Sequence, residues 1–300
     1  ALLSLLLVLM ILPSPTSAGT AVNLFQITTD GTQQTSHFIY KDLTIYTNLS
    51  DIWGYNLDTG ENFPVLEKDG QQFTTGLYRD LVMYENTDPS DLTTDIYMYN
   101  MRTGEDKLIA GGAGSQTSAV TNGKYVVYID GGACGSVHAY NLKNDIDAVI
   151  SPTGCHPLRI SDDTAVWPYA GAGGTNIYGY DLNQGKPLDI VIEVNFQESP
   201  DIFRDKVVWL HYITGVLGDY NAIKMKDLKT DEEKIICEST TTTLQWPAVS
   251  NRYIVWSESS AQHVNGIKAA DLKTGEVFEV QAQGPHQNSH TMPDIWRDTA

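Results

Sequence analysis

The chain has 300 residues, of which 41% are hydrophobic, and its 37 acidic residues outnumber the 19 basic ones to give a net charge of −18. This balance opposes binding to nucleic acid or to an anionic membrane surface, because both repel a negatively charged protein. Twenty-five glycines are typical of a chain built from strands and turns.

The chain opens on an apolar run, "ALLSLLLVLMIL" at 1–12, and small residues surround Ala18. The run is too short to span a membrane and matches the core of a secretory signal peptide. We therefore expect a signal peptide over 1–18, truncated at its start, and a single mature domain over 19–300. The mature protein is expected to be extracellular, periplasmic or attached to the cell surface.

Two phrases then alternate along the chain. The first, as in "IWGYNLDTGE" from Ile52, combines an apolar strand with a turn, and its central apolar residue recurs every 40 to 46 residues, at Leu57, Met101, Leu142, Leu182, Leu228 and Leu272. The second is a short β-branched run that ends on an aromatic residue, at Tyr46, Tyr84, Tyr128, Trp167, Trp209 and Trp256. Both have the alternation and composition of strands, and no segment has a helical period over three turns.

A third strand follows each turn and a fourth precedes each aromatic phrase. Four-stranded antiparallel units repeated every ~40 to 50 residues are typical of a β-propeller. We expect an all-β chain with six complete blades between about 33 and 283, and "HTMPDIWRDTA" opens a seventh that is C-terminally incomplete. The N-terminal strand at 22–28 is expected to close the last blade, since an open edge invites unwanted pairing.

The blade arrangement brings two of the three cysteines together. Cys134 falls in a loop between the second and third strands of the third repeat, and Cys155 falls in the loop that leads to the fourth repeat. In an antiparallel four-stranded meander, the loop between the second and third strands and the loop that leads to the next repeat lie at the same end of the strands. A disulfide between them is expected in an oxidising compartment, the alternative being that both stay free. Cys237 is left over.

The phrases "SPDIFRDKVVW" at 199–209 and "IYGYDLNQGK" at 177–186 resemble the repeats of TolB-like propellers, especially the seven-repeat forms of secreted and cell-surface proteins of bacteria and archaea. The resemblance covers residues 22–300 and implies the fold and an extracytoplasmic location. The chain has "RD", "DD" or "NR" where the commonest repeats have Ser-Pro-Asp-Gly. The family includes binding platforms, propeller domains of peptidases and a few lyases, so the resemblance implies no single activity.

Polar residues at the start of the innermost strands are candidates for a site at the channel mouth: His37, His156, Glu198, Gln245 and His290. Converging imidazoles and a carboxylate would suit a divalent metal or an acid–base pair. The alternative is a polar lining of a wet channel. Local catalytic and nucleotide-binding signatures are absent, so no catalytic residue is assigned and no cofactor is expected unless a divalent cation binds.

Two further loops fall on the same face. The loop at 85–95 holds Asp88, Asp91 and Asp95, whose spacing differs from that of a calcium loop, so a solvated acidic loop competes with a metal site. The loop at 210–221 is apolar and predicts either a partner surface or a lid over the channel, with candidates His211, Tyr212, Ile213, Val216 and Leu217.

Two functions follow from these features. The favoured one is a secreted or surface-associated, non-enzymatic propeller that binds a protein or carbohydrate on its loop-bearing face, either alone or as one module of a longer protein. The alternative is a propeller enzyme, a polysaccharide lyase or hydrolase, that uses the channel-mouth residues. A downstream domain in the full-length gene would distinguish a module from an independent protein.

Overall fold

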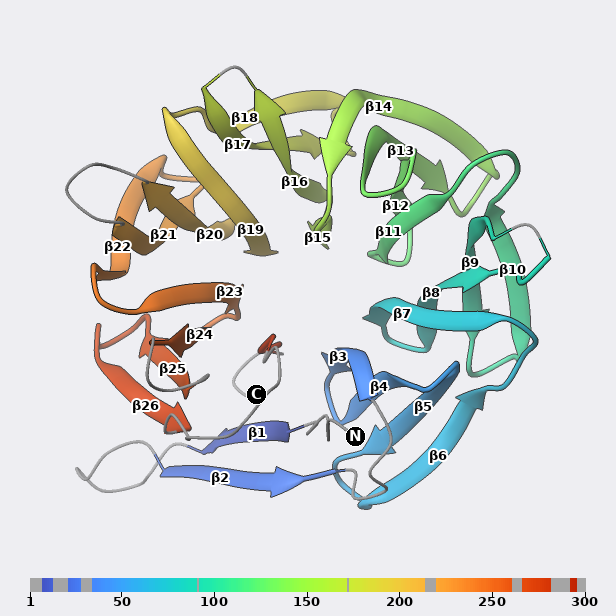
Figure 1. Ribbon diagram of the computed structural model, residues 1–300, viewed down its shortest axis with the longest axis horizontal. Helices are drawn as coiled ribbons and strands as arrows, with labels where there is room; N and C mark the ends of the chain where they lie inside the picture. The colour runs from blue at the N-terminus through green and yellow to red at the C-terminus, as the bar shows by residue number, and fades with distance from the viewer. Residues whose placement is uncertain are drawn as a thin grey trace. The chain divides into compact units, whose positions relative to one another are not determined.

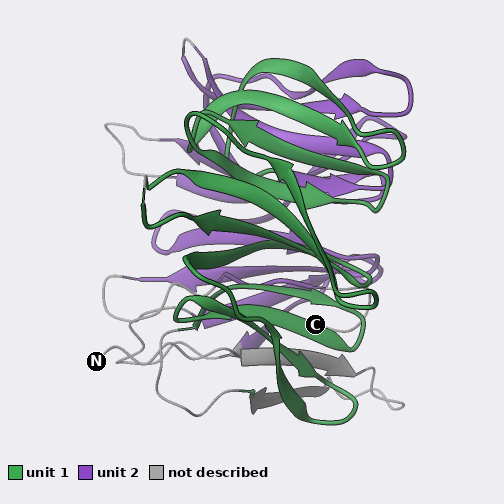
Figure 2. Cartoon of the chain, turned by 90° about the vertical axis from the view of Figure 1, so that its right-hand side faces the viewer, with its two compact units in different colours: residues 1–10, 23–158 green, residues 11–22, 159–300 purple. Residues whose placement is uncertain are grey.

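The computed structural model describes residues 7–12, 21–27, 34–90, 92–171, 173–213, 220–260, 266–281 and 292–295. These residues form twenty-six β-strands and no helix, which confirms the predicted all-β class. The chain divides into an N-terminal unit, residues 1–10 and 23–158, and a C-terminal unit, residues 11–22 and 159–300 (Figure 2).

The N-terminal unit contains three four-stranded antiparallel sheets that follow one another along the chain (Figure 1). The first strand of each sheet contacts the first strand of the next, β3 with β7 and β7 with β11. Their strands are β3 (Gln34–Tyr40), β4 (Leu43–Asn48), β5 (Asp51–Asn56) and β6 (Glu61–Leu66); β7 (Gln71–Tyr78), β8 (Leu81–Thr87), β9 (Thr94–Asn100) and β10 (Glu105–Ala110); β11 (Gln116–Thr121), β12 (Tyr125–Asp130), β13 (Cys134–Asn141) and β14 (Ile146–Cys155).

The C-terminal unit contains one eight-stranded and one four-stranded sheet. The larger sheet consists of two antiparallel meanders that a short parallel pairing of β17 with β19 joins, at Gly174 opposite Asn195 and Thr175 opposite Phe196. Its strands are β15 (Arg159–Ser161), β16 (Thr164–Gly171), β17 (Gly174–Asp181), β18 (Lys186–Val191), β19 (Asn195–Phe203), β20 (Lys206–Ile213), β21 (Tyr220–Asp227) and β22 (Glu232–Ser239). The smaller sheet is β23 (Thr243–Val249), β24 (Tyr253–Ser259), β25 (Gly266–Asp271) and β26 (Val277–Gln281).

The predicted count of six complete blades and a truncated seventh is wrong. The described strands form four separate four-stranded sheets, because β19 begins early enough to pair with β17 and so merges the fourth and fifth repeats. The N-terminal strand is β2 (Ala21–Gln26), and within the described part of the chain it pairs with β1 (Leu7–Leu12) in a two-stranded sheet, so its closure of the last blade stays a prediction. Residues 292–295, at the start of the seventh repeat, contain no strand. The signal-peptide boundary at residue 18 stays a prediction.

The hydrogen bonds of the turn explain why one phrase recurs along the chain. Asn56 ends the third strand of its repeat, and its Oδ1 accepts hydrogen bonds from the backbone N–H groups of Asp58 (2.9 Å) and Thr59 (3.0 Å). Gly60 then takes a left-handed conformation, with φ of +73°, which glycine adopts without steric cost. The hydrogen bond from a backbone N–H to a side-chain oxygen three residues earlier recurs in four other turns. The accepting residues there are Asn100, Asp181, Asp227 and Asp271. The phrase is therefore the closing hairpin of each repeat.

Apolar clusters hold neighbouring sheets of each unit together. In the N-terminal unit Met83 and Ile96 of one sheet pack with Val126 of the next, and all three are fully buried. In the C-terminal unit Val208 packs in the same way with Trp256. Each such side chain contributes ~1.5 to 3 kcal/mol by leaving water. The aromatic residues that mark the repeats are therefore core residues, since all six are buried.

Candidate functional site

The first strand of most repeats carries a β-bulge near its start. In β19 the pairing with β20 shifts between Glu198 and Asp201, and in β23 the pairing with β24 shifts between Gln245 and Ala248. One residue in several of these bulges has a positive φ, namely Ser36, Ser118, Ser199 and Trp246. Bulges redirect side chains and occur often beside functional sites. They lie where the sequence predicts the channel-mouth residues.

The channel-mouth candidates are divided between the two units, so their convergence stays a prediction. His37 lies half-buried in the bulge of β3, and the exposed His156 donates its backbone N–H to the carbonyl of Ala133 at 3.1 Å. In the C-terminal unit Glu198 is exposed and Gln245 is half-buried. His290 lies outside the described residues. Within the described part of the chain, no three His, Cys, Asp or Glu side chains are placed to hold a metal ion.

The acidic loop at 85–95 stabilises its own turn. Asp88 Oδ1 accepts the backbone N–H of Ser90 at 2.7 Å, and hydrogen bonds with Ser90 lower the pKa of the Asp88 carboxyl. Asp95 instead lies within β9, opposite Asn86 of β8. Asp91 lies outside the described residues. Nothing described brings Asp88 and Asp95 to a common ligand, so a cation there stays a prediction.

His211, expected on a partner surface, is buried, with 5% of its surface exposed. Its Nδ1 lies 3.3 Å from Nε2 of the fully buried Gln197, directly opposite on β19. Burial lowers the pKa of His211, and the nearby charge of Lys224 acts in the same direction, whereas Glu193 opposes both. The imidazole is therefore held in its neutral form between two strands. Tyr212 and Ile213 are half-buried, and Val216 and Leu217 lie outside the described residues.

Sequence reasoning missed a repeated glutamine that gives His211 its partner. A glutamine lies near the start of the first strand of several repeats, and its Nε2 bonds to a residue near the end of the second strand. Gln72 donates to Asn86 Oδ1 (2.7 Å) and Gln116 donates to Asp130 Oδ1 (3.0 Å) in the N-terminal unit. The sequence contains a pattern that could have revealed this contact, a glutamine followed two residues later by Ser or Thr. It occurs at Gln34, Gln72, Gln116 and Gln197.

An exposed apolar segment precedes and begins β19. Ile192, Val194 and Phe196 are 51%, 76% and 38% exposed, and we call them the 192–196 apolar segment. Phe196 lies opposite Tyr212 on β20, which links the segment to the loop that the sequence predicts as a partner surface. Glu193 within the segment contacts Lys224 at 3.3 Å, and the exposed Glu198 follows it. The segment therefore combines apolar side chains with acidic ones.

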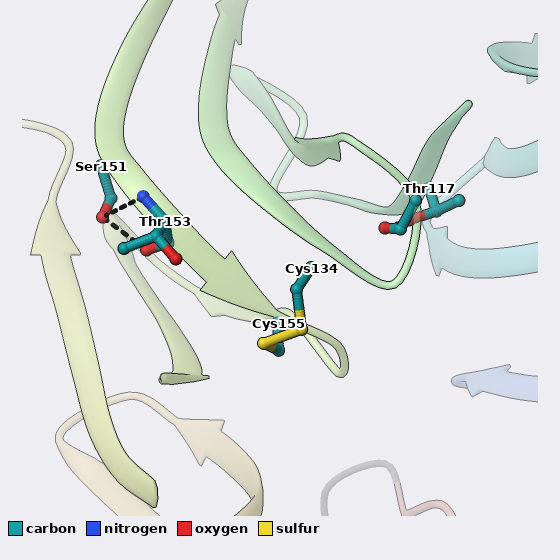
Figure 3. The surroundings of a disulfide bond; sticks show 6 residues. Thr117, Cys134, Ser151, Thr153 and Cys155 are labelled. Carbon is teal, nitrogen blue, oxygen red and sulfur yellow. Dashed lines mark hydrogen bonds between the residues drawn. A yellow bond between two sulfur atoms is a disulfide. The ribbon is translucent and has the colours of Figure 1, made fainter. Parts of the chain in front are cut away.

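The predicted pair Cys134 and Cys155 is joined by a disulfide (Figure 3). Both residues lie at strand ends rather than in loops, because β14 is long enough to place Cys155 directly opposite Cys134, the first residue of β13. Beside them Ser151 Oγ donates to the carbonyl of Thr153 at 2.7 Å. The disulfide therefore fixes one end of the third sheet. Cys237 is the free cysteine, and burial raises the pKa of its thiol.

Comparison with known proteins gives no match to a family model and none to the curated proteins. Solved structures do match. TolB from Acinetobacter baumannii has a TM-score of 0.57 at 14% identity over 80% of this chain and 60% of TolB. A puromycin hydrolase has a TM-score of 0.66 at 13% identity over 92% of this chain and 52% of the hydrolase. An oligogalacturonate lyase in complex with manganese has a TM-score of 0.53 at 11% identity over 83% of this chain and 73% of the lyase.

The chain has the fold of the TolB-like β-propellers. The resemblance read from the repeats is thus confirmed at the level of fold, and identities of 11% to 14% carry nothing beyond it. The chain spans 60% of the length of the Acinetobacter TolB and 52% of that of the puromycin hydrolase. No described helix has the length and apolar character of a membrane span.

Proposed function

We propose that this chain is a secreted or surface-associated propeller module that binds a partner protein through the 192–196 apolar segment. The observation that carries the proposal is the exposure of Val194, at 76% the highest among the exposed large hydrophobic side chains of the described residues. Large apolar side chains grouped on a rigid scaffold are favourable anchors for a protein partner, because their burial on binding releases water.

The charges around the segment indicate the chemistry of the partner. Glu193 and Glu198 lie within and directly after the segment, and the whole chain has a net charge of −18. A partner with an apolar patch flanked by lysine or arginine would be steered toward this surface. Aliphatic side chains such as Ile192 and Val194 offer a sugar no hydrogen bond, so the segment favours a protein over a carbohydrate.

The proposed location rests on two features. The sequence predicts a secretory leader, and Cys134 and Cys155 form a disulfide, which persists in oxidising compartments. Both support an extracellular, periplasmic or cell-surface protein. The alternative of a polysaccharide lyase or hydrolase is favoured by the likeness to the oligogalacturonate lyase, which is one of fold alone.

The proposal is tested by replacing the anchors. Purified wild-type chain immobilised on beads is incubated with the secreted fraction of its own source, and retained proteins are identified by mass spectrometry. The variant carrying Val194→Asp and Phe196→Asp is expected to lose a partner that the wild type retains. Ile235→Asp is the matched control, because Ile235 lies in the same unit on β22 and is 54% exposed. Equal retention by wild type and double variant would contradict the proposal.

A further inference from the structure

The third sheet contains a chain of three hydrogen-bonded polar side chains outside the predicted sites. Ser136 Oγ lies 3.0 Å from Nε2 of His138, and Nδ1 of the same ring lies 2.7 Å from Oδ2 of Asp147. All three belong to the N-terminal unit, Ser136 and His138 to β13 and Asp147 to β14. Both ring nitrogens of His138 are therefore engaged, one with a hydroxyl and one with a carboxylate.

The carboxylate decides which nitrogen carries the proton. Ionised Asp147 can only accept, so His138 Nδ1 donates to it, and Nε2 is left as an acceptor for the hydroxyl of Ser136. A serine hydroxyl that donates to an imidazole, itself oriented by a carboxylate, is the arrangement that activates serine as a nucleophile. The distances lie within the ~2.6 to 3.2 Å range in which a base takes a proton from a nucleophile.

The surrounding structure holds the ring and leaves the serine accessible. The His138 ring stacks on Tyr128 with centroids 5.0 Å apart, and its side chain is 13% exposed. Opposite Ser136 the pairing shifts, so that Pro152 and Thr153 together face a single residue of β13. Such a bulge displaces the neighbouring strand, and Ser136 is half-buried while Asp147 is 36% exposed. The group therefore opens to solvent.

We propose that Ser136, His138 and Asp147 form a nucleophilic serine centre that hydrolyses small carboxylic esters, an activity separate from partner binding. Ser136 Oγ bonds to the ester carbonyl carbon while its proton passes to His138 Nε2. The carbon–oxygen bond to the leaving alcohol then breaks, and the alkoxide takes the proton from Nε2. Water repeats the sequence on the acyl-serine, releases the carboxylic acid and restores the hydroxyl. Asp147 is a positioning residue, since it acts through the ring.

An alkyl fluorophosphonate tests the centre without knowledge of the natural ester. Activated Ser136 displaces fluoride from phosphorus, and peptide mass mapping is expected to find the adduct at Ser136. The variant Ser136→Ala is expected to give no adduct. His138→Gln is expected to slow labelling by roughly 100-fold or more, the usual contribution of a general base. Ser151→Ala is the matched control, because Ser151 lies on β14 of the same sheet, bonds to Thr153 and should label at the wild-type rate.

The dependence of the labelling rate on pH distinguishes a nucleophilic centre from a hydrogen-bonded cluster with only a structural role. The labelling rate of the wild type is expected to rise with pH, because a general base must be unprotonated to accept the serine proton, and Asp147→Asn is expected to lower and shift that rise. This measurement needs only the wild type if a variant fails to fold. Absence of an adduct at Ser136, or a labelling rate independent of pH, would overturn the proposal and leave the three residues as a structural tie.

Discussion

Asp201 is a buried carboxyl group whose ionisation should affect the pH dependence of stability. It lies on β19 of the C-terminal unit, where its Oδ2 accepts the backbone N–H of Val249 at 2.7 Å and its Oδ1 lies 3.5 Å from Nε of Arg159. Its side chain is only 16% exposed. Burial raises the pKa of Asp201 from 3.8 to about 6, and Arg159 and the bond from Val249 only partly offset this, whereas Asp294 adds to it.

The contribution of Asp201 to the free energy of unfolding follows from the difference between its pKa values in the folded and unfolded states. A shift from 3.8 to about 6 corresponds to roughly 3 kcal/mol, at about 1.4 kcal/mol for each unit. Because the folded protein binds this proton more tightly than the unfolded chain does, the contribution is fully present below pH 3.8. It is lost as the pH rises through 6. The substitution Asp201→Asn removes the titration and keeps an oxygen that can accept from Val249.

The assay is urea unfolding of wild type and Asp201→Asn at a series of pH values from 4 to 8 (about the window of the shift). The free energy of unfolding of the wild type, minus that of the variant, should fall by roughly 3 kcal/mol across the series. Groups that titrate equally in both proteins cancel in this difference.

The variant Asp145→Asn should show the opposite dependence of the stability difference on pH. The hydrogen bond from Lys107 to Asp145 lowers the pKa of Asp145, so its contribution is present above the unfolded pKa and is lost as the pH falls. The wild type minus Asp145→Asn difference should therefore rise with pH in the range below the ordinary value of 3.8, so the series for this variant is extended below pH 4. A wild type minus Asp201→Asn difference that stays constant from pH 4 to 8 would refute the reasoning about burial of Asp201.

Two further substitutions test the fold. Replacing Cys134 and Cys155 together by serine should lower the free energy of unfolding by ~3 kcal/mol, since the disulfide closes a loop of 21 residues; a urea midpoint equal to that of the oxidised wild type would show that the bond adds nothing. Gly179→Ala should cost ~1 to 3 kcal/mol, because a Cβ there would lie 2.8 Å from the backbone oxygen of Ala165, and an unchanged thermal unfolding midpoint would contradict this close approach.

Part of the candidate site was visible in the sequence. Exposed apolar character near Tyr212 was predicted, but the side chains that carry it in the described residues are Ile192, Val194 and Phe196, from the segment that precedes β19. His211 was misplaced because a polar residue near a loop resembles a surface residue. Its burial depends on Gln197, which lies opposite it on another strand. Contacts between residues on different strands cannot be predicted from a local sequence pattern.

The repeat and its turns were determined by the sequence alone. The turn at Asn56 needs only an acceptor side chain and a glycine four residues later, and alternation of bulky residues needs only a strand with two faces. Such conformational preferences act within a few residues, so they can be recognised in the amino-acid sequence.

Only the tertiary structure decided how the repeats join and which polar groups meet. The merging of β17 with β19 depends on where β19 begins, and the contact of His138 with Asp147 depends on the register of two strands around a bulge. A shift of one residue in either pairing would turn the side chains to the opposite face. Register is set by packing over the whole sheet, which is why local patterns predicted the strands and could not predict their meeting points.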